Sequence, residues 1–135
     1  MPSHSPPLRR FVLLRLLRWG LLIGALYDLG FAVLMVAAPN LPAQWFHLPL
    51  PGEPFYLWLC AVLLSALALM YLLAAHDPHR YSGNIAVAIL ARGLGFLALG
   101  YAASGRPELA GLWIVALVDL GFAAVHAASY LPLRN

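Results

Sequence analysis

FYLWLCAVLLSALALMYLLAA, residues 55–75, is the stretch that decides the fold of this chain. It contains no charged side chain and no proline. About 20 apolar residues in an α-helix, each rising about 1.5 Å, cross the ~30 Å hydrocarbon core of a bilayer. The stretch also lacks the alternation of polar and apolar residues that is typical of a membrane β-strand. It therefore predicts a transmembrane helix.

Three similar apolar runs lie on either side of it, at residues 11–38, 85–103 and 109–131. Every proline of the chain falls outside the four runs. This distribution favours helices, because proline removes a backbone hydrogen bond from a helix interior. We therefore predict an all-α integral membrane protein, a four-helix bundle of up-down topology over residues 11–131. A disordered cytoplasmic segment, residues 1–10, is expected to precede it.

The overall composition agrees with this fold class. Of the 135 residues, 63% are hydrophobic and 10% are charged, whereas about a quarter of the residues in a soluble domain are charged. The formal net charge is +3, and every basic residue is an arginine. Apart from Arg92, the arginines lie at the ends of the apolar runs rather than on one polar face. The expected partner is therefore the lipid bilayer and not a nucleic acid.

The arginines also predict an orientation. One side of the membrane would carry Arg106 alone, and the other side would carry Arg9, Arg10, Arg15, Arg18, Arg80 and Arg134. Because cytoplasmic segments are enriched in Arg and Lys, both termini are expected in the cytoplasm of a bacterial inner (plasma) membrane protein. Tyr71 and Tyr130 are expected among the aromatic residues of the cytoplasmic interface.

The connection between the first two runs, PNLPAQWFHLPLPGEP at residues 39–54, is rich in both proline and large apolar side chains. A peptide that carries Trp45, Phe46 and Leu48 gains free energy by leaving water. We expect it to lie on the outer membrane surface or to fold over the mouth of the bundle. It would act either as a stiff interfacial connector or as a lid over a ligand.

Three charged residues lie deep inside the predicted helices, away from their ends: Asp28, Arg92 and Asp119. Counted from the helix ends at about 1.5 Å per residue, each lies about 12–15 Å deep. Charges at this depth are rare and normally pair inside a bundle, and one guanidinium can bridge two carboxylates. We therefore predict an intramembrane charged cluster of Asp28, Arg92 and Asp119. It would serve either as a lock between helices or as a functional site.

His126 and Tyr130 extend this hypothesis toward the cytoplasm. His126 follows Asp119 by two helical turns and Tyr130 follows one turn later, so the three share a helix face. Such a stripe would suit the movement of protons, although a lone buried histidine is more often structural. Tyr27, beside Asp28, is a further candidate for contact with a proton path or a ligand.

No catalytic residue, cofactor or metal is expected. The second motif of the presenilin-type aspartyl proteases, Gly-x-Gly-Asp, is missing before Asp119, and an arginine at the same level opposes a shared proton between two carboxyls. A b-type haem needs two facing ligands, and His126 alone lies within a helix. Cys60 is the single cysteine, which excludes an internal disulfide and a thiolate cluster.

Small residues spaced four apart, such as Gly20 and Gly24 or Ala91 and Gly95, allow helices to approach closely. The contacts would lie within the bundle or between subunits, so other membrane subunits and further copies of this chain are candidate partners. The segment LYDLGFA at residues 26–32 is also echoed by LVDLGFA at residues 117–123. The echo is either an inverted duplication, as in many transporters, or a coincidence in a chain rich in Leu, Gly and Ala.

The phrases PLPGEPFYLWLCAVLL and HDPHRYSGNIAVAILARGLGF, with the Asp-Leu-Gly-Phe stretch of the first run, resemble the DoxX-like group of small bacterial membrane proteins. The resemblance covers roughly residues 15–130 and is one of layout and phrasing. Since DoxX is associated with a thiosulfate:quinone oxidoreductase, the resemblance implies a membrane subunit or a partner in the quinone zone, and no reaction.

These observations favour a non-enzymatic membrane subunit or scaffold whose charged cluster fixes the packing of the helices. The alternative is a small transporter or proton-coupled carrier with a midplane charged site. A cavity that reaches the cluster would favour the carrier, because a scaffold should pack the cluster dry.

Overall fold

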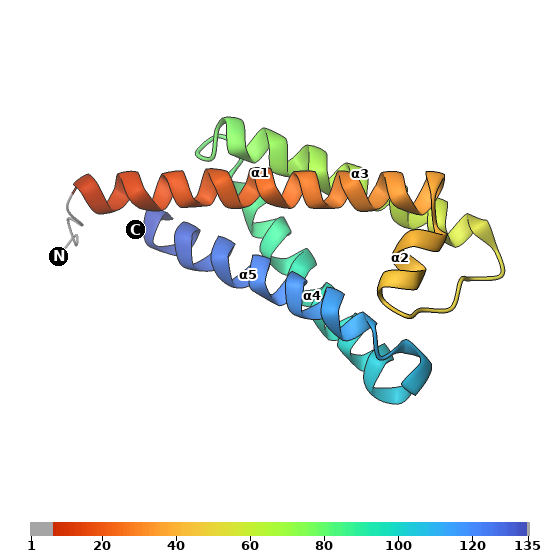
Figure 1. The fold of residues 1–135 in the computed structure, drawn as a ribbon. Helices are drawn as coiled ribbons and strands as arrows, with labels where there is room; N and C mark the ends of the chain where they lie inside the picture. The colour runs from red at the N-terminus through yellow and green to blue at the C-terminus, as the bar shows by residue number, and fades with distance from the viewer. Residues whose placement is uncertain (1–6, 135) are drawn as a thin grey trace.

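The computed structural model describes residues 7–134, and every regular element in them is helical. Figure 1 shows α1 (Pro7–Ala37), the short α2 (Asn40–Trp45), α3 (Pro54–His76), α4 (Ser82–Gly105) and α5 (Leu112–Arg134), with a 3-10 turn, η1 (Pro107–Leu109), before α5. The four long helices are all long and apolar enough to cross a membrane. The predicted all-α fold with four membrane-spanning helices is therefore confirmed, and the chain is a multi-pass membrane protein.

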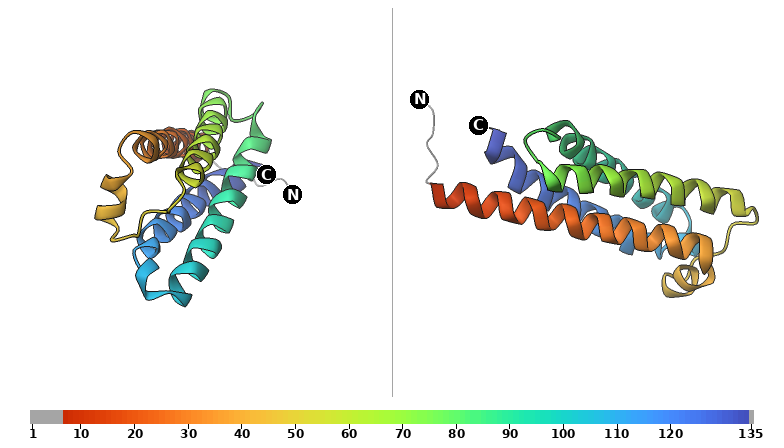
Figure 2. Two further views of the ribbon diagram at one scale, coloured as in Figure 1. Left: turned by 90° about the vertical axis from the view of Figure 1, so that its right-hand side faces the viewer. Right: turned by 90° about the horizontal axis from the view of Figure 1, so that it is seen from above.

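The four long helices form two packed pairs. α1 packs most extensively against α3, and α4 against α5, while α1 also contacts α5 and α3 contacts α4. The start of α1 and the end of α5 lie at one end of the bundle, and α2 and η1 lie at the other, which we call the α2 end (Figures 1 and 2). The two pairs diverge toward the α2 end (Figure 1). Successive long helices run in opposite directions between these two ends, which is the predicted up-down topology.

Several helix ends differ from the sequence-based boundaries. α1 begins at Pro7 rather than at residue 11, so residues 7–10, which were expected to be disordered, are helical. Proline is well tolerated in the first turn of a helix, where its missing N–H has no partner to lose, and Leu and Arg are good helix formers. Residues 1–6 lie outside the described part of the chain. α5 begins at Leu112 instead of residue 109, because residues 107–109 form η1.

Many small apolar side chains lie in the interior of the bundle and many large ones lie on its surface, in contrast to a soluble bundle. The interior holds many small side chains, among them Ala25, Ala68 and Ala88, while Leu26 is 73% exposed and Leu94 is 65% exposed. Membrane helices pack through small residues because lipid is as good a neighbour for leucine as protein is. The apolar outer surface is therefore the surface that contacts the bilayer.

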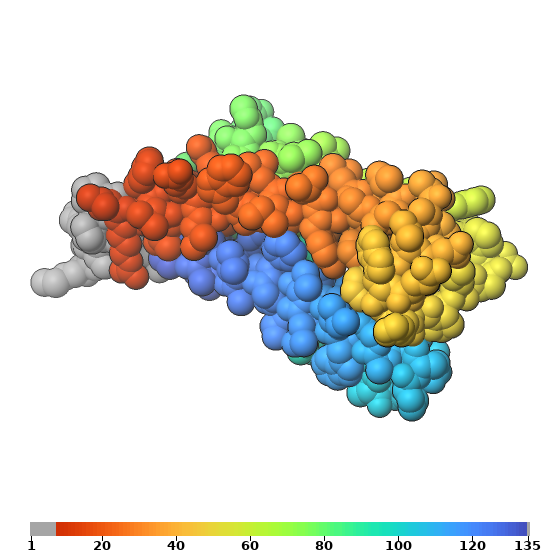
Figure 3. Space-filling model, in the orientation of Figure 1, coloured from red at the N-terminus to blue at the C-terminus, as the bar shows by residue number. Residues whose placement is uncertain are grey.

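The connection between α1 and α3, residues 39–54, contains the short helix α2, which its proline-rich sequence did not predict. After α2, the ring of Phe46 stacks on Phe31 of α1 with 5.8 Å between ring centroids. On the opposite side, a Cβ atom at Gly111 would overlap the carbonyl oxygen of Phe46. The connection therefore touches both α1 and the start of α5, and it folds back over the α2 end of the bundle (Figure 3). Trp45 remains 57% exposed.

Candidate functional site

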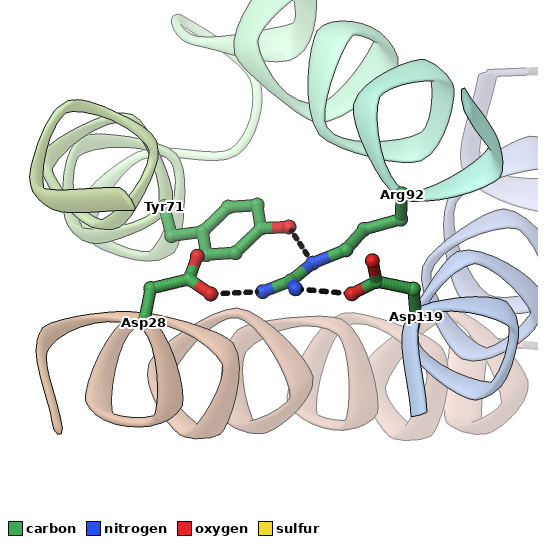
Figure 4. A network of polar contacts seen from close by, with 4 residues as sticks. All are labelled: Asp28, Tyr71, Arg92 and Asp119. Atoms are coloured by element: carbon green, nitrogen blue, oxygen red, sulfur yellow. Dashed lines mark hydrogen bonds and ion pairs between the residues drawn. The ribbon is translucent and has the colours of Figure 1, made fainter. Parts of the chain in front are cut away.

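The guanidinium of Arg92 joins all four long helices (Figure 4). Its Nη2 donates to Asp28 Oδ1 of α1 at 2.5 Å, and its Nη1 donates to Asp119 Oδ1 of α5 at 2.5 Å. Its Nε donates to the hydroxyl of Tyr71 of α3 at 2.8 Å. One side chain of α4 thus holds one group on each of the other three helices. The structure brings together the three residues that the sequence placed at one depth.

The charged cluster is nearly dry. Asp28 is fully buried, Arg92 is 3% exposed and Asp119 is 7% exposed. Gly95, almost one turn after Arg92 on α4, makes room for it, because a Cβ atom at this position would overlap Asp119 Oδ2. The glycine therefore lets α4 and α5 approach until the carboxylate meets the guanidinium.

Tyr71 is the member of this network that the sequence pattern did not predict. It was expected at the cytoplasmic interface, yet its side chain is fully buried and bonded to Arg92. Side chains on a helix tilt toward the helix N-terminus, and α3 runs from the α2 end toward the termini. The phenol therefore points back into the middle of the bundle. A tyrosine hydroxyl that is buried needs a hydrogen-bond partner. This requirement is the one feature of Tyr71 that could have linked it to the charged cluster.

Aromatic rings surround the guanidinium. The Cζ atom of Arg92 lies 5.0 Å from the ring centroid of Phe122 and 5.5 Å from those of Tyr27 and Tyr71. A cation within about 6 Å of a ring face is attracted by the ring quadrupole, more strongly where water is excluded. These rings stabilise the positive charge at the centre of the bundle, and they place Tyr27 beside the charged cluster.

Two carboxylate oxygens remain without a hydrogen bond from residues 7–134: Oδ2 of Asp28, which is fully buried, and Oδ2 of Asp119. The side chain of Asp119 keeps 10% of its exposure, while that of Asp28 keeps none. Asp119 is therefore the carboxylate of the cluster with an oxygen that a small molecule can reach.

His126 and Tyr130 are both buried on α5, although Tyr130 was expected among the aromatic residues of the cytoplasmic interface. The ring of His126 packs edge-on against Tyr71 and stacks on Phe122, at 5.5 and 5.9 Å between centroids. Neither ring nitrogen has a well-formed hydrogen bond to residues 7–134, and Tyr130 donates to the carbonyl of Ser82 at 3.3 Å. In the described part of the chain no hydrogen bond links Asp119, His126 and Tyr130, so the proton path remains a hypothesis.

A cavity of about 380 Å³ lies between the charged cluster and the connection at residues 39–54. Arg92, Asp119 and Tyr27 line its deep end, and Phe31, Phe46 and Leu48 line the end near α2. The remaining lining is mostly aliphatic. Such a space, apolar along its walls and polar at one end, has the form of a small-molecule site.

Comparison with protein-family models, with curated proteins and with solved structures finds no match to this chain. The similarity to DoxX-like proteins accordingly stays a prediction.

Proposed function

We propose that this protein is a small membrane carrier or binding protein, which holds a small amphipathic molecule between its charged cluster and its outer connection, residues 39–54. The cavity that reaches Arg92 and Asp119 carries this proposal. A bundle whose charges serve only as a lock would pack them without adjoining space. The proposal assigns no reaction to the protein.

The shape of the site restricts the ligand. A volume of about 380 Å³ lies near the lower end of the ~300–1,000 Å³ typical of ligand pockets. The aliphatic walls and the rings of Phe31 and Phe46 would cover an apolar body, while the polar end would orient a single polar group. The ligand is thus one that also partitions into a bilayer.

The proposed topology follows the arginine distribution, with both termini in the cytoplasm of a bacterial inner membrane and the α2 end outside. In this orientation the outer connection covers the cavity on the outer side. Its contacts with Phe31 and Gly111 hold it across the diverging helix pairs. It would act as the lid rather than as a simple connector.

A cavity-filling substitution tests the proposal. Val115 of α5 lines the cavity, whereas its neighbour Ile114 is 53% exposed on the outer surface and does not. The probe is the neutral amphipathic dye N-phenyl-1-naphthylamine, added to protein in nanodiscs, with empty nanodiscs subtracted. We expect saturable fluorescence from the wild type and from Ile114→Phe, and a loss of at least tenfold in affinity from Val115→Phe. Equal binding by both variants would place the dye elsewhere and refute this site.

A DoxX-like membrane subunit or scaffold is the second candidate, and the near-complete burial of the charged cluster favours it. Under this function, neutralising Asp28, Arg92 and Asp119 together would leave biological activity intact, provided that the helices still pack. Complementation of a deletion strain by the triple variant separates the two functions, because a carrier would lose its polar site. Purification in mild detergent would then identify the partner subunit.

A further inference from the structure

We propose that the occupant of the cavity is a small lipophilic cation, whose charged end lies at Asp119 and whose binding displaces one proton from the cluster. This inference rests on the proposed function, because it names the ligand class of the same site. It follows from the charges of the cluster, from the one reachable carboxylate oxygen and from the walls of the cavity.

The charges of the cluster do not balance. With Asp28 and Asp119 ionised and Arg92 protonated, two negative charges face one positive charge, which leaves a net charge of −1. A net charge in the dry interior of a membrane protein is costly unless it is paired. The cluster therefore holds one further positive charge, either a proton or a bound cation.

No side chain around the cluster supplies that charge. The titratable and charged groups that face Asp119 come from every long helix: Tyr27 and Asp28 of α1, Tyr71 of α3, Arg92 of α4 and, beyond the ring of Phe122, His126 of α5. The chain contains no lysine. The imidazole of His126 lies against Tyr71 and Phe122 and donates no hydrogen bond to either carboxylate.

The geometry of Asp119 selects where a cation would lie. Arg92 occupies Oδ1, while Oδ2 accepts no hydrogen bond from residues 7–134, and the residue lines the cavity. Asp28 is sealed from the cavity by comparison, being fully buried. An anion at this position would make the net charge of the cluster −2, and a neutral ligand would leave it at −1. A monovalent cation is the ligand that neutralises it.

The walls of the cavity also suit a cation with an apolar body. Tyr27, Phe31 and Phe46 line the cavity, and their rings are linked, with Tyr27 and Phe31 4.9 Å apart and Phe31 and Phe46 5.8 Å apart between centroids. Aromatic rings attract ammonium groups, and Tyr27 is the ring of this row that lies at the same end of the cavity as Asp119, while Phe31 and Phe46 cover the apolar body. The rest of the wall is aliphatic and covers the body of the ligand.

The exchange balances in atoms and charge. The neutral carboxyl of Asp119 releases its O–H proton to water, and the resulting carboxylate pairs with the incoming cation. The cluster carries no net charge before and after the step. Below the pKa of this carboxyl, one proton is therefore released for each monovalent cation bound, and the affinity for the cation falls tenfold for each further pH unit.

The experiment compares two probes of one shape. Benzyltrimethylammonium is a cation, and neopentylbenzene is its neutral counterpart, in which carbon replaces nitrogen. Binding of each to the full chain in nanodiscs is measured by competition with N-phenyl-1-naphthylamine, and proton release by calorimetry in two buffers of different ionisation enthalpy. We expect the cation to bind at least tenfold more tightly than the neutral probe, with release of about one proton.

One variant extends the test. Asp119→Asn should abolish both the preference for the cation and the proton release. Because this change also removes a partner of Arg92, the wild-type comparison of the two probes stands as an independent measurement. Equal affinity for both probes, or cation binding without proton release, would overturn the inference while leaving the proposed function intact. If the dye also fails to bind the wild type, the proposed function falls with it.

Discussion

Removal of Arg92 alone should damage this protein more than removal of the whole charged cluster. In Arg92→Leu, Asp28 and Asp119 each lose the hydrogen bond that Arg92 donates to Oδ1. Asp28 is fully buried in the wild type, so water does not replace its lost partner. Breaking a buried ion pair by deleting one member typically costs about 3–5 kcal/mol, a large part of the ~5–15 kcal/mol that stabilises a folded domain.

The triple variant Asp28→Asn, Arg92→Leu, Asp119→Asn leaves no charge in the interior. Replacement of a buried ion triad as a whole is often neutral or even stabilising. We therefore expect its stability to lie within about 2 kcal/mol of the wild type, and so above that of Arg92→Leu. The predicted ranking of the two variants by stability follows from the structure, because Arg92 is the only residue that forms an ion pair with both carboxylates in the described chain.

The assay is equilibrium unfolding in mixed micelles of mild detergent and dodecyl sulfate, followed by circular dichroism. Arg106→Leu is the matched control, because Arg106 is exposed between α4 and η1 and forms no ion pair with residues 7–134. It should unfold with the wild type. The reasoning about a buried charge left without a partner would be refuted if Arg92→Leu unfolded at the same midpoint as the wild type. It would also be refuted if the triple variant were less stable than Arg92→Leu.

Three further predictions concern the close approach at the cluster, the missed tyrosine and the topology. Gly95→Ala should lower the free energy of unfolding by about 1–3 kcal/mol, because the new Cβ would overlap Asp119 Oδ2, whereas Gly93→Ala on the same helix meets nothing within 4 Å and should be neutral or slightly stabilising. The same unfolding assay checks both, and equal stabilities would contradict the packing. Tyr71→Phe should destabilise the protein by about 1–3 kcal/mol, because it leaves the buried Nε–H of Arg92 without an acceptor; Tyr101→Phe, at a residue 84% exposed, is the control and should match the wild type. In a Cys60→Ser background, His47→Cys should react with a membrane-impermeant maleimide on intact cells, and His79→Cys should react only after lysis. Both side chains are exposed, and they lie at opposite ends of the bundle. The reverse labelling pattern would show that the topology is inverted.

The sequence predicted the fold because a bilayer imposes one requirement that can be read from a single chain. Each long apolar run must satisfy its own backbone hydrogen bonds, so each becomes a helix. The depth of Asp28, Arg92 and Asp119 followed from counting residues, and the need to pair charges in lipid brought them to one point. The predictions of helices, of the depth of the charges and of their pairing needed no knowledge of which helices are neighbours.

The features that the sequence did not predict depend on helix rotation and on close packing. Tyr71 looked like an interfacial residue because its depth was counted from its Cα atom, while its hydroxyl reaches toward the middle of the bundle. The room that Gly95 leaves for Asp119 depends on how α4 and α5 face each other. The cavity depends on the divergence of the two helix pairs, which leaves no pattern in the sequence. It also depends on the connection at residues 39–54, whose apolar side chains had indicated that it could fold over the mouth of the bundle.

The position of Arg92 in the third of the four long helices has a consequence for how the chain enters the membrane during synthesis. An arginine near the centre of a helix adds roughly 2.5–3.5 kcal/mol to the free energy of insertion. When α4 leaves the ribosome, α1 and α3 have already been made, so Asp28 and Tyr71 are present to receive the guanidinium. Asp119 arrives last, with α5, and its carboxylate meets an arginine that is already in place. The order of the helices along the chain thus lets each charge enter the bilayer after its first partner, except for Asp28, which waits alone until α4 is made.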